Sequence, residues 1–131
     1  MNLMRVIRFL RGLSLFAPAV AAAGILSGCG DAAPPEPLPL SEAPAAVDTA
    51  FKDATPEARA LAAEVKAAAQ SSDSPRAFVE LQAMQSRPDL TPEQREVVAR
   101  SLAGAAEELN AAAARGDARA QQILNLHRAR K

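Results

Sequence analysis

The chain has 131 residues, which is the length of one small domain with room for a targeting segment. Its 15 basic and 15 acidic residues balance, but Arg5, Arg8 and Arg11 all precede the first acidic residue, Asp31. Without those three arginines, 12 basic residues face 15 acidic ones, so the rest of the chain gives no electrostatic basis for binding nucleic acid. A single cysteine excludes an internal disulfide.

The first 28 residues are typical of a secretory signal peptide. A basic segment, residues 1–11, precedes an uncharged apolar run over residues 13–26, and small residues follow. A permanent transmembrane helix is one alternative, but it needs about 20 predominantly apolar residues, and this run is shorter and contains Pro18. A plain secretory signal is the other, because residues 21–23 (AAA) offer an A-x-A cleavage site.

The end of the apolar run favours a lipoprotein signal over both alternatives. Leu26-Ser27-Gly28-Cys29 resembles the lipobox of bacterial lipoproteins, which is a branched apolar residue, two small residues and an obligatory cysteine. The resemblance implies cleavage between Gly28 and Cys29, a diacylglyceryl group on the Cys29 thiol, and often acylation of the new amino group, for instance by palmitate. Two or more acyl chains anchor a protein stably, whereas one does not. By this resemblance Cys29 is the lipid anchor and the first residue of the mature chain.

The residues after Cys29 bear on which membrane holds the anchor. In enteric bacteria, an aspartate directly after the lipid-bearing cysteine tends to retain a lipoprotein in the inner membrane. Here Gly30 takes that place and Asp31 comes one residue later. The resemblance therefore favours the outer membrane, facing the periplasm.

Residues 29–46 are expected to form the lipid anchor and a disordered, Pro-rich linker. Closely spaced prolines remove backbone donors and favour an extended polyproline II conformation. At about 3.1 Å per residue such a linker could reach roughly 50 Å from the bilayer. A semi-rigid spacer and a linker of no particular length both fit this pattern. The prolines are Pro34, Pro35, Pro37, Pro39 and Pro44.

Residues 47–131 predict an all-α domain, a small Ala-rich bundle of about four short helices. Thr55-Pro56 and Thr91-Pro92 each supply an N-cap and a proline in the first helical turn, and Gln94 completes a capping box. Ser74-Pro75 starts a further helix, and residues 115–117 (RGD) end one helix and begin the last. The apolar positions at helical spacing are Ala58, Leu61, Ala62, Val65 and Ala69; Phe78, Leu81 and Met84; Val98, Leu102, Ala105, Leu109 and Ala112; and Ala120, Ile123, Leu124 and His127.

The two Thr-Pro helix starts lie 36 residues apart. Residues 55–61 (TPEARAL) recur as residues 91–97 (TPEQREV), with threonine, proline, glutamate and arginine at matching positions. Two helix–turn–helix units of this length resemble a degenerate tetratricopeptide-like pair, which implies a binding module. The apolar seam after Thr91 fits either an intramolecular bundle or a partner helix.

The side chains needed for catalysis are scarce. His127 is the only histidine and Cys29 is assigned to lipid, so nucleophile, base and metal-ligand sets are missing from the sequence. Glu107 and Glu108 are adjacent, so on a helix they point about 100° apart and do not face one site. We therefore expect no enzymatic activity, no cofactor and no small-molecule substrate.

Residues 127–131 (HRARK) are the remaining candidate feature. Cations are favourable at a helix C-terminus, and they also suit a contact with anionic envelope polymer or lipid headgroups. Arg130-Lys131 resembles the terminus of the major murein lipoprotein family, which implies attachment of Lys131 to peptidoglycan. That family forms one uninterrupted heptad helix, whereas prolines interrupt this chain. We expect a membrane-anchored protein with a structural or protein-interaction role in the bacterial cell envelope.

Overall fold

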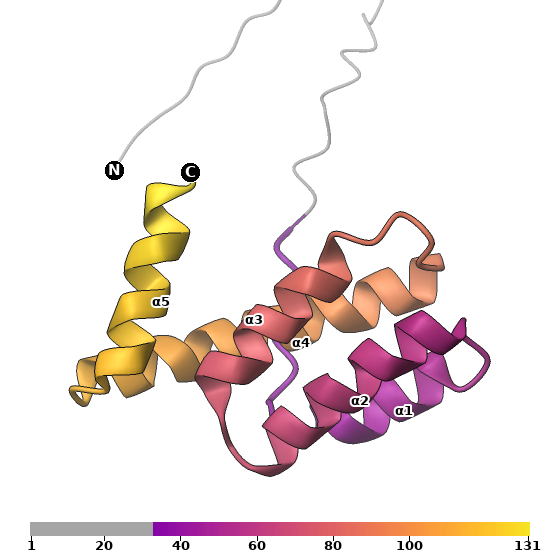
Figure 1. The fold of residues 1–131 in the computed structure, drawn as a ribbon, viewed down its shortest axis with the longest axis horizontal. Helices are drawn as coiled ribbons and strands as arrows, with labels where there is room; N and C mark the ends of the chain where they lie inside the picture. The colour runs from indigo at the N-terminus through magenta and orange to yellow at the C-terminus, as the bar shows by residue number, and fades with distance from the viewer. Residues whose placement is uncertain (1–32) are drawn as a thin grey trace, which may run out of the picture. The chain divides into compact units, whose positions relative to one another are not determined.

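The computed structural model describes residues 33–131, which fold into an all-α domain (Figure 1). The signal peptide and lipobox predicted within residues 1–29 lie outside the described residues. Residues 33–131 contain no strand. The helices are α1 (Ala43–Phe51), α2 (Pro56–Gln70), α3 (Ser74–Gln85), α4 (Pro92–Ala114) and α5 (Ala118–Ala129).

The predicted Thr-Pro helix starts are confirmed. The Thr55 hydroxyl accepts from the Ala58 amide at 3.3 Å and caps α2. At the start of α4 the Thr91 hydroxyl accepts from the Gln94 amide at 3.2 Å, and the Gln94 side chain accepts from the Thr91 amide at 3.0 Å. This reciprocal pair satisfies two amides that the first helical turn leaves without a backbone partner.

The α2–α3 and α4–α5 turns are built alike. Each contains one residue in the left-handed region, Ser72 with φ 56° and Gly116 with φ 94°. The amide of the following aspartate, Asp73 or Asp117, then donates to a carbonyl five residues earlier, at 2.9 and 3.1 Å. This is a Schellman motif, and each aspartate also caps the next helix with its side chain. One aspartate therefore ends one helix and starts another at both turns.

The apolar stripes predicted on α2, α3 and α4 face inward. Helix α3 packs between α2 and α4, while α1 packs on α2 and α4. The seam of α4 therefore closes an intramolecular bundle. Ser101 of α4 is fully buried, and its hydroxyl oxygen has no hydrogen-bond partner among the described residues. The largest fully buried apolar side chains are Phe51, Leu40, Leu81, Met84, Leu109, Val47, Val65 and Val98.

Helix α1 was not predicted from the sequence, and it corrects the expected boundary at residue 47. It begins at Ala43, inside the predicted linker, and buries Val47 and Phe51. Pro44 stands in the first turn of α1. A proline is tolerated there because the first amides of a helix have no intrahelical acceptor. Pro44 therefore marks a helix start, whereas the neighbouring prolines made it look like part of a linker.

The segment before α1 is also part of the fold, because it crosses α4 in close contact. The Leu38 amide donates to the Arg100 carbonyl at 2.9 Å, and the Arg100 guanidinium donates to the Glu36 carbonyl at 3.2 Å. A Cβ on Gly104 would lie 1.9 Å from the Leu38 carbonyl oxygen, so only glycine allows this approach. Leu38 and Leu40 are buried.

This fixed segment shortens the predicted linker. Residues from Glu36 onward are held on the domain, so only seven residue steps separate Cys29 from the first fixed point. Seven extended steps span at most about 25 Å, roughly half the reach expected from the sequence.

Helix α5 is packed much less than the other helices. It runs across their direction and projects from one end of the domain (Figure 1). Of its side chains, only Ala120 is fully buried, while Ile123 and Leu124 are half-buried and Leu126 is 53% exposed. Its attachment to α4 and α3 therefore rests on few apolar contacts.

Candidate functional site

The predicted lipobox, Leu26, Ser27, Gly28 and Cys29, lies outside the described residues. The domain itself offers three places for a site. These are a polar cleft near the two Schellman turns, the surroundings of His127, and the exposed surface shared by α3 and α5.

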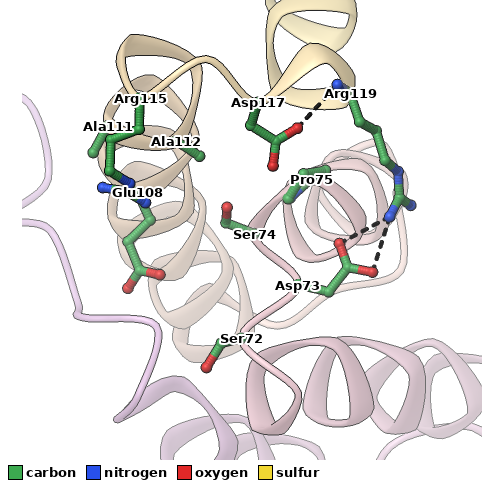
Figure 2. A pocket seen from close by; sticks show the side chains of 10 residues that line it. All are labelled: Ser72, Asp73, Ser74, Pro75, Glu108, Ala111, Ala112, Arg115, Asp117 and Arg119. Carbon is green, nitrogen blue, oxygen red and sulfur yellow. Dashed lines mark hydrogen bonds and ion pairs between the residues drawn. The ribbon is translucent and has the colours of Figure 1, made fainter.

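The polar cleft has a volume of about 500 Å³ and lies between the α2–α3 turn, the end of α4 and the start of α5 (Figure 2). The Arg119 guanidinium donates to both carboxylate oxygens of Asp73, at 3.1 and 3.2 Å. On the same side, the Asp117 carboxylate accepts from the Arg119 and Ala120 amides at 2.9 and 3.0 Å. Glu108 and Arg115 stand on the opposite wall (Figure 2).

The Asp73 carboxylate is tuned to stay ionised. Partial burial raises the pKa of Asp73. Hydrogen bonds from the Arg76 amide and the Arg119 guanidinium, together with the charges of both arginines, lower this pKa by more than burial raises it. The net result is a pKa below the ordinary 3.8. Such a carboxylate is a poor proton donor or acceptor near neutral pH. The cleft is therefore a charged joint that holds α5 to the α2–α3 turn.

His127 packs α5 against α3. Its ring meets the Phe78 ring edge-on, with centroids 5.4 Å apart and an interplanar angle of 85°. Its Nδ1 shares a hydrogen bond with the Gln82 amide nitrogen at 2.9 Å. Both contacts join the two helices, so they give His127 a packing role.

An apolar surface between α3 and α5 was not expected from the sequence. Val79 of α3 and Leu126 of α5 are 46% and 53% exposed, and both line a hollow of about 130 Å³. Ile123, Gln82, His127 and Arg130 complete its lining. Neither Val79 nor Leu126 belongs to the apolar stripes. Their positions outside the stripes were the available signal that they face away from the core.

The cations of residues 127–131 stand at and just after the C-terminal end of α5. Arg128, Arg130 and Lys131 are exposed, and none forms an ion pair with another residue of the described range. Arg128 stands in the last turn of α5, where a positive charge opposes the partial negative charge of the helix end. Arg130 also lines the apolar hollow.

Within residues 33–131, no three histidine, cysteine or acidic side chains come together as a metal site. In the same range, no helix has the length and apolarity required to cross a bilayer. Glu107 and Glu108 are exposed, and only Glu108 reaches the polar cleft.

Comparisons with protein-family models, curated proteins and solved structures find no match to this chain.

Proposed function

We propose that this chain is a bacterial lipoprotein, anchored to the envelope through Cys29 and carrying a non-enzymatic helical domain. The observation that carries the proposal is the order of its first 29 residues. A basic segment, an apolar run and Leu26-Ser27-Gly28 lead directly to the sole cysteine. Gly30, in place of an aspartate, supports the outer membrane as the location.

The domain has a structural or protein-interaction role in the envelope. Two features support such a role over catalysis. The ion pair in the polar cleft joins helices, and His127 is engaged in packing between α3 and α5. The rival binding-module hypothesis, a tetratricopeptide-like pair, rests on the 36-residue spacing of the Thr-Pro caps. The helices that they start differ in length, 15 residues for α2 and 23 for α4, which weakens the case for a repeat.

Fatty-acid labelling tests the anchor. Cells expressing the wild type or Cys29→Ala are grown with an alkyne-bearing palmitate analogue, then separated into membrane and soluble fractions. We expect label on the wild type in the membrane fraction and no label on Cys29→Ala. Equal labelling of both chains, or an unlabelled wild type that is processed normally, contradicts lipidation at Cys29.

A second candidate function is covalent attachment to peptidoglycan through Lys131. The exposure of Lys131 favours it. Digestion of purified cell walls with muramidase and protease gives a C-terminal peptide joined through Lys131 if the hypothesis is right. Recovery of only free C-terminal peptides excludes it.

A further inference from the structure

The charges of the domain are separated along the chain. Residues 33–117 contain 14 acidic and 8 basic residues, whereas residues 118–131 contain four basic residues and no acidic one. Three of those four, Arg128, Arg130 and Lys131, are free of ion pairs with the described residues. The domain is therefore an acidic body with a cationic end on α5.

The cationic end adjoins the apolar surface between α3 and α5. Among the described residues, Val79 and Leu126 are the most exposed large apolar side chains. Arg130 lines the same hollow as both of them. Exposed apolar side chains bordered by arginine and lysine are typical of surfaces that lie in the headgroup region of anionic lipid.

The position of the anchor brings this end toward the bilayer. The chain is fixed to α4 from Glu36, so acyl chains on Cys29 hold the domain within about 25 Å of the membrane surface. The first described residues and the C-terminal end of α5 lie toward the same edge of the domain (Figure 1). The point where the anchor joins the domain and the cationic end of α5 therefore face one side.

We propose that α5 is a second, electrostatic contact with the membrane that holds the lipid anchor, an inference that rests on the proposed function. Arg128, Arg130 and Lys131 contact the phosphates of anionic lipids, while Leu126 and Val79 enter the boundary between headgroups and acyl chains. The acidic body is repelled by the same surface and points away from it. The anchor and α5 together fix the orientation of the domain.

The test uses the fact that a lipidated Cys29 leaves the chain without a free thiol. Leu126→Cys introduces one reactive thiol, which is labelled with an environment-sensitive fluorophore. Val79→Cys provides a second labelled position. Ala60→Cys, on the exposed side of α2, is the matched control. Each full-length, lipidated protein is reconstituted into vesicles of pure phosphatidylcholine or of equal parts phosphatidylcholine and phosphatidylglycerol.

We expect a blue shift of the labels at positions 126 and 79 in the anionic vesicles only. The control label at position 60 should emit equally in both vesicle types. Combining Leu126→Cys with Arg128→Gln, Arg130→Gln and Lys131→Gln should abolish the shift, while the protein stays vesicle-bound through its acyl chains. High salt should reduce the shift in the same way, because screening weakens the attraction between surface charges.

Three outcomes overturn the inference. One is that the labels at positions 126 and 79 remain in water in anionic vesicles although the chain is vesicle-bound. Another is an equal shift of the control label. The third is a shift that requires added envelope protein, which would mean that a protein covers this surface.

Failure of the proposed function looks different from these outcomes. In that case the wild-type protein itself reacts with the thiol label, because Cys29 is free. A wild type that does not react, with position 126 in water, contradicts only the membrane contact of α5.

Discussion

Helices α4 and α5 are neighbours in the chain, but they are stabilised in different ways. Helix α4 places Val98, Ala105 and Leu109, each fully buried, against the other helices, and its start is closed by a capping box. Helix α5 buries only Ala120 completely and relies on the Asp73–Arg119 ion pair and the contacts of His127. The difference shows that helical periodicity alone does not say how much of a face will be buried.

The largest difference is expected between leucines of the two helices. Leu109→Ala removes a fully buried side chain from α4 and should lower the free energy of unfolding by about 2–5 kcal/mol. Leu124→Ala in α5 should cost less than about 1.5 kcal/mol, because Leu124 is only half-buried and its site remains open to water. Urea denaturation of both variants measures the difference, and equal losses would contradict the contrast.

Gly104→Ala should detach the segment that crosses α4. The added Cβ meets the Leu38 carbonyl, so the segment must move, losing one hydrogen bond and the burial of Leu38. We expect a net loss of roughly 1–3 kcal/mol despite the better helix propensity of alanine. Hydrogen exchange at the Leu38 amide should also become much faster.

The control for this prediction is Ala103→Gly, next to Gly104 on α4. It should cost about 1 kcal/mol through helix propensity alone and leave exchange at the Leu38 amide unchanged. If Gly104→Ala also left this amide protected, the close approach would not be what requires glycine.

The two left-handed turn residues should respond in opposite directions. Ser72→Gly removes the steric cost of a side chain at φ 56° and should stabilise the domain by up to about 1 kcal/mol. Gly116→Ala introduces that cost at φ 94° and should destabilise it by a similar amount, about 1 kcal/mol. Thermal unfolding of the pair checks the signs. The same sign for both variants would contradict the shared turn geometry.

The joint between α5 and the body should depend on pH. Asp73→Asn keeps an N-cap residue but loses the charge that pairs with Arg119, at an expected cost of roughly 0.5–1 kcal/mol because the pair is partly exposed. The folded-state pKa of Asp73 lies below 3.8, so its contribution is full above that pH and is lost as the pH falls through the folded value. The difference between wild type and variant should therefore shrink below pH 3.8. A difference that stays constant with pH would exclude the charge as its cause.

Much of the fold could be predicted from the sequence because it depends on local chemistry. Thr55 and Thr91 cap the helices that they were expected to cap, and the stripe from Val98 to Ala112 faces the core. These signals depend on residues within one or two turns of each other. A cap therefore predicts a helix start, and a stripe predicts a buried face, without knowledge of the rest of the chain.

The features that escaped prediction depend on distant contacts. Gly104 stood alone in the sequence, and its role appears only because Leu38, 66 positions earlier, crosses it. A glycine within an Ala-rich helix is a signal of close approach, but it does not name the partner. The exposure of Leu126 was missed for a similar reason, since α5 has a neighbour on only part of its surface. The assignments of Leu26, Ser27, Gly28 and Cys29 remain predictions.

Intact mass spectrometry of the membrane-extracted protein tests the central claim most directly. We predict a wild-type chain that begins at Cys29 and carries the added mass of a diacylglyceryl group, with or without a further acyl group. The Cys29→Ala chain should carry no lipid. A wild-type chain that begins at Gly24 without lipid, or that retains residues 1–28, would contradict the account.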